Sequence, residues 1–318
     1  MAVVNVQELD RLLLHPSGRE DLRGLMRCWR EDRVLFRLPG MAGFAAAPSL
    51  LNKVRGAWGA VLLESGSVQV RQRRPCGWKR ACAAEIFFGA RPLLEVAGQV
   101  NEITKPYVLE AGRRGGDLVI VLRIFGLAGD WRREAVMAMA QALRGSVRWR
   151  DLARDGGLFV PRVVDVAEPR ERRLEGLSPV AGKGEEAQLV FLAPVDAETG
   201  RLRDAPWLLF ERLRVRLAMV ARWHDLDLSE SWGRLEEDWL GCSYEVSEVS
   251  LPARRDAGMA RGGHRFRNRV DRPVRIVMAG ALGNLWPLLE LGRRVHVGRG
   301  ASIGLGAYRL GDRSAWPV

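Results

Sequence analysis

Residues 295–310, VHVGRGASIGLGAYRL, form the stretch around which the sequence is organised. Glycine has no Cβ, so a loop rich in glycine can adopt positive φ and bring backbone N–H groups close to a phosphate. The positive charge of Arg299 adds attraction for any polyanion. The spacing is not that of a P-loop, because no Gly-Lys-Ser/Thr follows, and glycine-rich turns also occur as simple hairpin turns. The candidate phosphate-binding residues are Gly298, Arg299, Gly300, Ser302, Gly304 and Gly306.

The composition indicates a folded protein with a polyanionic partner. The chain has 318 residues, enough for two domains, and 47% of them are hydrophobic, which favours a substantial core. It carries 50 basic and 38 acidic residues, a net charge of +12. Codon usage accounts for part of the preference for arginine over lysine but not for this excess of positive charge. Nucleic acid is therefore favoured over a membrane surface, since no basic amphipathic helix dominates.

Location and cofactors are predicted from what the sequence lacks. No apolar run is long enough to span a membrane, and the N-terminus lacks the basic start and cleavage site of a signal peptide, so we expect a cytoplasmic protein. The four cysteines are scattered. Cys76 and Cys82 have no second pair to complete a zinc site, so we expect neither a metal nor another cofactor.

The first half of the chain predicts an α+β domain. Residues 1–30 read as two short helices, an N-terminal extension, and residues 156–186 read as a linker rich in Gly, Pro and charge. Residues 31–155 lie between them. Their predicted elements follow the order strand, helix, strand, strand, helix, strand of a ferredoxin-like (RRM-like, βαββαβ) domain. Its elements are predicted at 33–39, 48–63, 105–110, 117–126, after Asp130, and at 146–152.

The second half, residues 187–318, predicts a second ferredoxin-like domain. A helical insertion is expected at about 206–240, and the glycine-rich loop, 298–306, leads into the final strand. The remaining elements are strands at 187–194, 243–251 and 272–278 and a helix at 282–291. The two halves share no obvious sequence repeat, so the tandem duplication is inferred from the order of elements together with the family resemblance given next.

The C-terminal stretch also carries a family resemblance. Residues 280–306, GALGNLWPLLELGRRVHVGRGASIGLG, resemble the C-terminal signature of the CRISPR RNA-processing endoribonucleases of the RAMP superfamily. In that superfamily the glycine-rich loop precedes the final strand of a ferredoxin-like domain. Residues 54–59, VRGAWG, are similar to its first helix, and residues 84–88, AEIFF, resemble a further family segment. The resemblance covers most of the chain from Arg33 onward.

The resemblance implies a metal-independent endoribonuclease that binds the repeat hairpin of precursor CRISPR RNA. In such enzymes the substrate's 2′-hydroxyl attacks the adjacent phosphate and leaves a 2′,3′-cyclic phosphate, and the mature guide RNA stays bound. CRISPR repeat RNA and other effector subunits are the expected partners. The scarcity of lysine and the helical insertion fit a divergent subtype, with the type IV systems as a candidate. The alternatives are a non-catalytic RAMP subunit of an effector complex and a general RNA-binding module.

Four residues are candidates for the catalytic step. Histidine suits proton transfer because its pKa lies near neutrality, but its position varies in the resembled family. His264 lies in a basic loop. His296 enters the glycine-rich loop, and its alternation with Val295 and Val297 predicts a strand in which it faces away from them. Without histidine, residues such as Arg23 and Tyr308 could orient the 2′-hydroxyl and neutralise the phosphate.

Further basic residues are candidates for holding the RNA backbone. Three arginines alternate around Phe266, which would place their guanidinium groups on one edge of a strand. The stretch 71–80 is a second basic loop, containing Pro75 and Gly77. The predicted RNA-binding arginines outside the glycine-rich loop are Arg212, Arg216, Arg261, Arg265, Arg267 and Arg269.

Overall fold

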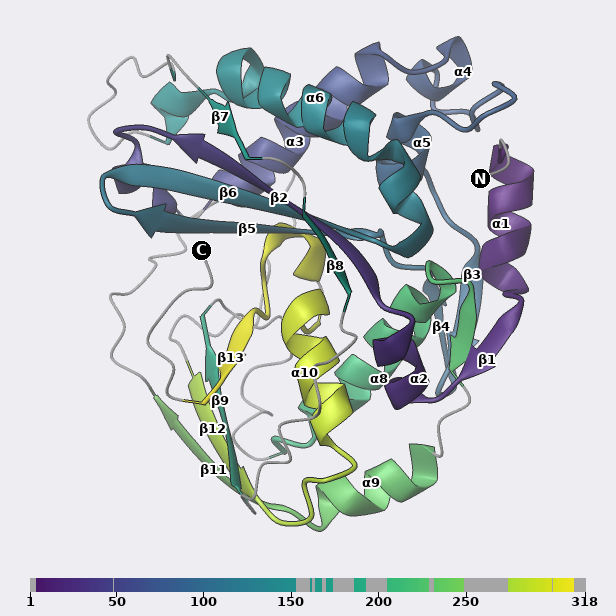
Figure 1. The fold of residues 1–318 in the computed structure, drawn as a ribbon, viewed down its shortest axis with the longest axis vertical. Coiled ribbons are helices and arrows are strands. Elements are labelled where there is room, and N and C mark those ends of the chain that lie inside the picture. The colour runs from purple at the N-terminus through teal and green to yellow at the C-terminus, as the bar shows by residue number, and fades with distance from the viewer. Residues whose placement is uncertain are drawn as a thin grey trace. The chain divides into compact units, whose positions relative to one another are not determined.

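The computed structural model describes residues 4–47, 49–152, 161, 164–167, 170–173, 186–192, 205–228, 232–248, 274–298 and 300–311 (Figure 1). The chain divides into two compact units. Unit 1 comprises Met1–Arg19, Trp29–Arg173 and Met219–Asp227, and unit 2 comprises Glu20–Cys28, Leu174–Ala218 and Leu228–Val318. Each contains helices and an antiparallel sheet, which confirms the predicted α+β class. The predicted linker, 156–186, lies mostly outside the described residues.

Unit 1 is built on a sheet in the order β5-β6-β2-β7, with β8 also paired to β2. All of these pairs are antiparallel. Strand β6 is buried along its whole length, which explains its nearly continuous apolar sequence. The strands are β2 (Arg30–Leu38), β5 (Tyr107–Arg114), β6 (Asp117–Phe125), β7 (Asp165–Val166) and β8 (Arg170–Arg173).

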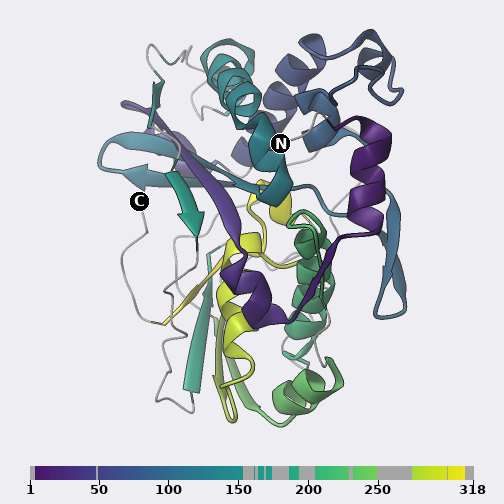
Figure 2. The same ribbon diagram turned by 45° about the vertical axis from the view of Figure 1, so that its right-hand side comes forward.

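Helices α3 (Leu50–Glu64) and α6 (Arg132–Gln141) pack against each other on one face of this sheet (Figures 1 and 2). The indole of Trp58 is fully buried between them and donates a hydrogen bond to the Ala135 carbonyl oxygen at 3.1 Å. The other elements of unit 1 are α1 (Val6–Leu14), η1 (Ala42–Ala46), α4 (Val68–Arg71), α5 (Ala83–Phe88), the hairpin of β3 (Leu93–Val96) and β4 (Gln99–Glu102), and η2 (Gly126–Trp131).

The strand predicted at 146–152 is wrong. Residues 142–146 form a π-helical turn, and a 3₁₀ turn, η4 (Trp149–Asp151), follows. The cause is the buried Trp149, whose indole N–H donates to the Leu143 carbonyl oxygen at 3.0 Å and whose ring packs edge-on against Phe44. The position beside β2 is occupied by β7 and β8 instead.

Unit 2 has a four-stranded sheet in the order β11-β12-β9-β13, again antiparallel throughout. Its strands are β9 (Glu186–Phe191), β11 (Ser243–Glu248), β12 (Val274–Ala279) and β13 (Tyr308–Leu310). Each lies within a few residues of a predicted strand. Its helices are α2 (Leu22–Arg27), α8 (Leu208–Arg222, whose last turn belongs to unit 1), α9 (Trp232–Leu240) and α10 (Trp286–Val295).

Helices α8 and α10 lie on the same face of the sheet of unit 2 (Figures 1 and 2). Gly292 of α10 permits close packing, because a Cβ there would approach Leu213 of α8 to 2.7 Å. Both α8 and α9 fall in the stretch predicted as a helical insertion, 206–240. The described residues also include β1 (Gly18–Glu20), which pairs with β10 (Leu226–Leu228).

Candidate nucleic-acid interface

The glycine-rich loop joins α10 to β13 and bends at its glycines. Their φ angles are 79° at Gly298, 78° at Gly300, 80° at Gly304 and 67° at Gly306. These values lie in the left-handed region, which residues with a Cβ seldom adopt. Between the second and third glycine lies a short 3₁₀ turn, η5 (Ala301–Ile303). The sequence-based expectation of positive φ in this loop is therefore confirmed.

Backbone contacts close the loop on itself. The N–H of Val297 donates to the Gly306 carbonyl oxygen at 3.2 Å, and the N–H of Leu305 donates to the Gly300 carbonyl oxygen at 3.3 Å. A Cβ at Gly306 would overlap the carbonyl oxygen of Val297. The path of the backbone is thus set by the protein itself, and it requires glycine at position 306. Ser302 is half-buried in this loop, and Arg299 lies outside the described residues.

His296 does not lie in a strand, so this prediction is wrong. Helix α10 continues to Val295, and His296 is its C-cap, with φ 60° and ψ 171°. The His296 N–H donates to the Gly292 carbonyl oxygen at 2.8 Å. Because the chain is not extended here, Val295, His296 and Val297 are all buried and do not alternate between faces. With 1% of its surface exposed, the His296 side chain belongs to the core of unit 2.

Tyr308 is likewise a core residue, 3% exposed. Its hydroxyl donates to the Leu289 carbonyl oxygen at 2.6 Å, and its ring packs against Phe191 with 5.4 Å between centroids. Burial, helped by the nearby Glu290 carboxylate, raises the pKa of Tyr308 well above its ordinary value. The side chain therefore connects the first residue of β13 to α10.

The predicted arginines differ in their surroundings. Arg23 on α2 and Arg212 on α8 are exposed, and α2 packs against α10. Arg216 is half-buried, and its Nε donates to the Val295 carbonyl oxygen at 3.2 Å, where a cation stabilises the C-terminus of α10. Besides Arg299, the predicted residues that lie outside the described part of the chain are Arg261, His264, Arg265, Arg267 and Arg269.

One acidic residue beside the loop was missed by the sequence analysis. Glu290 is buried on α10 and forms ion pairs with Arg293 and with Arg294, the latter at 3.3 Å. These two arginines precede the loop, and Glu290 offsets their charge. The spacing of three and four residues, which places side chains on one face of a helix, is the signal that could have revealed it.

The described residues offer neither a membrane span nor a cluster of metal ligands. Within the described part of the chain, no helix has the length and apolar character needed to cross a bilayer. Among the same residues, no three side chains of His, Cys, Asp or Glu gather in a way that could hold a metal ion.

Comparisons with known proteins give structural similarities alone. No protein-family model and no curated protein matches the sequence. A solved Cas6 product complex is similar with a TM-score of 0.48 and 18% identity, over 89% of this chain and 100% of the other. A Cas6 substrate mimic complex has a TM-score of 0.46 and 16% identity, over 89% and 99%. Thermus thermophilus Cse3, bound to an RNA representing a pre-cleavage complex, has a TM-score of 0.30 and 14% identity, over 89% and 100%.

These values are too low to establish a shared activity. All three TM-scores are below 0.5, and no identity exceeds 18%.

Proposed function

We propose that the chain is a metal-independent endoribonuclease that binds the repeat hairpin of precursor CRISPR RNA and cleaves it to mature guide RNA. The observation that carries the proposal is the glycine-rich loop. It combines the signature resemblance of residues 280–306 with four left-handed glycines and a final strand directly after it. The product stays bound, and other effector subunits and a cytoplasmic location fit the same assignment. The type IV subtype remains a prediction.

The order of strands supports a ferredoxin-like assignment for both units. In unit 2 the chain runs β9, α8, β11, β12, α10, β13, and the first strand lies between the third and the fourth. In unit 1 it runs β2, α3, β5, β6, α6, β7, and the first strand again lies between the third and the fourth. The βαββαβ order is that of ferredoxin-like domains. We propose two such domains. The first, predicted at 31–155, would extend to β7 at Val166, and the second is 187–318, with α9 as the addition.

The RNA backbone would be held by the loop through two kinds of contact. Left-handed glycines allow backbone N–H groups to approach phosphate oxygens without interference from a Cβ. Ser302 can donate a hydrogen bond, and Arg299 supplies a guanidinium that suits phosphate. Arg23 and Arg212 are exposed on unit 2 and would add electrostatic attraction.

Cleavage requires only proton transfer and charge stabilisation from the protein. The 2′-oxygen loses its proton, attacks the adjacent phosphorus, and the 5′-oxygen leaves and takes up a proton, giving a 2′,3′-cyclic phosphate and a 5′-hydroxyl. His264 stays a candidate for the proton transfer. Arg23 is exposed and could orient the 2′-hydroxyl and neutralise the phosphate. His296 and Tyr308 are buried, so we assign them to positioning the loop.

The test is incubation of a repeat hairpin with the full chain in EDTA. We expect cleavage with a 2′,3′-cyclic phosphate end, and no cleavage of the same RNA carrying a 2′-deoxy nucleotide before the scissile phosphate. Cleavage that depends on added Mg²⁺, or that proceeds on the 2′-deoxy RNA, contradicts the proposal.

A second candidate function is a non-catalytic RAMP subunit that binds guide RNA with the same loop. It is favoured by one observation: His296, the single histidine among the described residues of unit 2, is buried. Tight hairpin binding without any cleavage would support this alternative. Binding without preference for a repeat hairpin would support a general RNA-binding module instead.

A further inference from the structure

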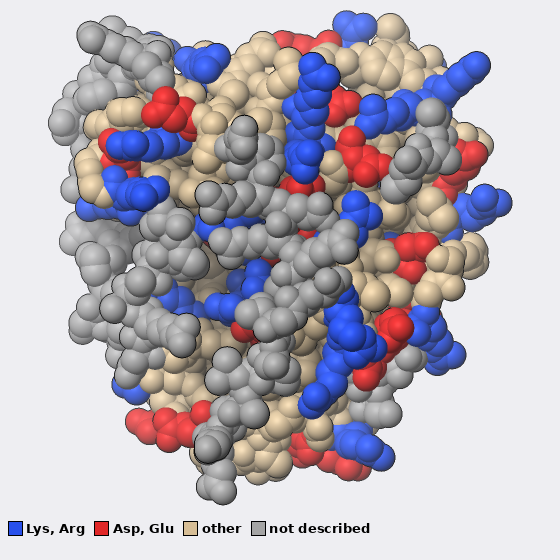
Figure 3. Space-filling view, in the orientation of Figure 1, with Lys and Arg blue, Asp and Glu red and all other residues tan. Residues whose placement is uncertain are grey.

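A second basic surface lies on unit 1, in the loop between α4 and α5. We call residues 71–80, RQRRPCGWKR, the basic loop. All of its residues except Cys76 are exposed, and no acidic residue occurs from position 65 to position 84. Lys and Arg side chains project at the upper right of Figure 3, over the part of unit 1 that holds α4 in Figure 1.

An exposed tryptophan lies among these charges. Trp78 has 50% of its surface exposed and is the one exposed tryptophan among the described residues. Leaving a large aromatic ring in water forgoes the stabilisation that burial would give. A ring in this position can stack on a flat partner, and nucleic-acid bases are partners of this kind.

Most cations of the basic loop are available to a ligand. Arg80 is an exception, because it pairs with Glu134 at 3.2 Å and lies over the Trp131 ring at 5.0 Å. No ion pair with another described residue is found for the other four, Arg71, Arg73, Arg74 and Lys79. Four positive charges in one short loop, none paired with an acidic residue of the described chain, favour a polyanion.

The protein holds this loop in shape from both sides. Near its start, the Arg74 N–H donates to the Gln69 carbonyl oxygen at 2.8 Å, and Arg73 has a positive φ of 61°. Such a backbone is uncommon outside glycine and is often found where function requires it.

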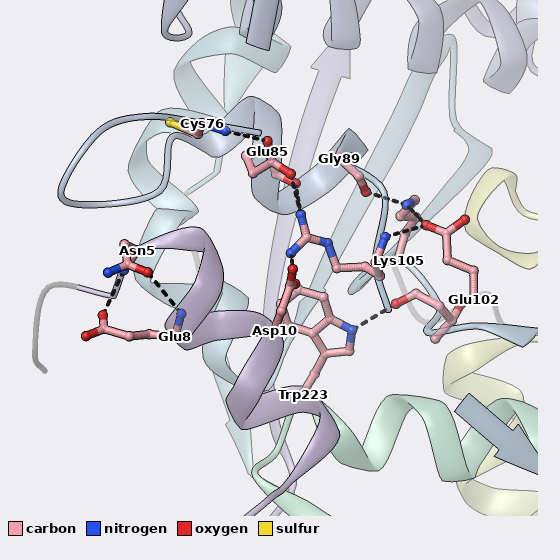
Figure 4. Close-up of polar contacts among 11 residues, drawn as sticks. Asn5, Glu8, Asp10, Cys76, Glu85, Gly89, Glu102, Lys105 and Trp223 are labelled. Carbon is pink, nitrogen blue, oxygen red and sulfur yellow. Dashed lines mark hydrogen bonds and ion pairs between the residues drawn. The ribbon is translucent and has the colours of Figure 1, made fainter. Parts of the chain in front are cut away.

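In the middle of the loop, the Cys76 N–H donates to Glu85 Oε2 at 3.1 Å (Figure 4). Glu85 in turn pairs with the buried Arg91 at 2.6 Å, and Arg91 pairs with Asp10 at 2.8 Å. The pKa of the Cys76 thiol lies below its ordinary value. Burial acts to raise this pKa, but hydrogen bonds from Ser67 and from the backbone of Trp78 lower it by more. The loop is therefore tied to a buried anchor at Cys76, two residues before Trp78, whose ring stays exposed.

We propose that the basic loop is a binding site for single-stranded RNA, in which an unpaired base stacks on Trp78 and the neighbouring cations contact the flanking phosphates. Charge alone would also suit a double helix or an acidic protein. The exposed ring decides between these, because only unpaired bases offer a free face for stacking. The site lies within unit 1 and does not depend on cleavage by the glycine-rich loop.

The stacking contact is tested with the full chain and a fluorescent oligoadenylate of about 12 nucleotides, followed by anisotropy. We expect Trp78→Ala to weaken binding about 5- to 100-fold and Trp78→Phe to retain most of it. Met137→Ala, at a residue of unit 1 that is 63% exposed, is the matched control and should bind like the wild type. An abasic strand of equal length should bind equally to the wild type and Trp78→Ala. The proposal is overturned if Trp78→Ala loses as much affinity for the abasic strand as for oligoadenylate, or if it loses no affinity for oligoadenylate.

The charge contact is tested by two double reversals with the same change in net charge. Arg73→Glu with Arg74→Glu should lower the slope of log affinity against log salt by about 1.4, the value for two lost phosphate contacts on a single strand. The control is Arg113→Glu with Arg114→Glu, at exposed residues of the β5–β6 hairpin, which should lower this salt slope less. Equal effects of the two, or competition by polyglutamate as strong as by RNA, contradict the assignment.

The readouts also separate this site from the proposed endoribonuclease. Cleavage of a hairpin without single-stranded flanks should be the same for Trp78→Ala and the wild type. A wild-type chain that fails to cleave but still binds oligoadenylate through Trp78 would contradict the endoribonuclease alone.

Discussion

The glycine-rich loop of unit 2 and the basic loop of unit 1 are shaped in opposite ways. In residues 298–306 the backbone sets the shape, through four left-handed glycines and hydrogen bonds between Val297, Gly300, Leu305 and Gly306. In residues 71–80 a backbone hydrogen bond from Arg74 to Gln69 holds the start, but side chains hold the rest, through Glu85 at Cys76 and Arg80 at the end. The first loop should therefore be sensitive to any added Cβ, whereas the second should be sensitive to the loss of side chains and their partners.

The largest expected effect is on the anchor of the basic loop. Arg91→Met leaves Glu85 as a buried carboxylate without its cation, which should cost about 3–5 kcal/mol of unfolding free energy in urea titrations. The affinity for oligoadenylate should fall as well, because Glu85 accepts the Cys76 N–H and so holds the basic loop in shape. The control is Arg37→Met, which breaks a pair whose arginine is 55% exposed and should cost at most about 1 kcal/mol. A cost for Arg91→Met no larger than this control would contradict the anchoring role.

The next effect concerns the backbone of the glycine-rich loop. Gly306→Ala places a Cβ against the Val297 carbonyl oxygen at a φ of 67°, and it should cost about 3 kcal/mol. Gly311→Ala is the matched control, since its φ is 76° but nothing lies within 4 Å of a Cβ there, and it should cost about 1 kcal/mol. Hairpin affinity should fall for the first variant and be kept by the second. If both bind the hairpin equally well, the shape of this loop does not matter for RNA.

A smaller effect distinguishes a structural from a catalytic Tyr308. Tyr308→Phe removes the hydrogen bond to the Leu289 carbonyl oxygen and should cost about 1 kcal/mol without slowing cleavage. Because burial raises the pKa of Tyr308 in the folded chain, its contribution is complete below the unfolded pKa of about 10 and is lost as pH rises above it. Urea titrations from neutral to alkaline pH should therefore show a larger alkaline loss for the wild type. A variant that unfolds normally but no longer cleaves RNA would assign Tyr308 to the reaction.

Apolar patterns predicted the sheets well because burial and sequence are linked directly there. Strand β6 was recognisable from its continuous apolar run, and the glycines of the terminal loop from the need for positive φ. The errors came from contacts distant in sequence or from the length of a helix. Trp149 replaces a strand by a turn, since its ring packs against the distant Phe44, and α10 continues far enough to make His296 a helix cap.

The environments of the site residues were harder to predict. Tyr308 and His296 were candidates for the catalytic step, but both are buried, and the space for the Tyr308 hydroxyl depends on the missing Cβ of Gly292 on another element. In the same way, Trp78 could not be distinguished from the core tryptophans by sequence, because its exposure depends on how Cys76 and Glu85 hold the loop. Spacing along the chain gives residue type and element, and tertiary packing decides which side chains reach the surface.

The most direct test of the central claim is hairpin affinity as a function of salt for a chain carrying Arg299→Glu and Gly304→Val. The valine is strained at a φ of 80° and the charge is reversed, so we expect at least about tenfold weaker binding and a salt slope smaller by about one. Arg234→Glu with Gly311→Val, which matches the charge change and the positive φ elsewhere in unit 2, should keep the affinity. Unchanged affinity and slope in the first variant would contradict RNA binding by the glycine-rich loop.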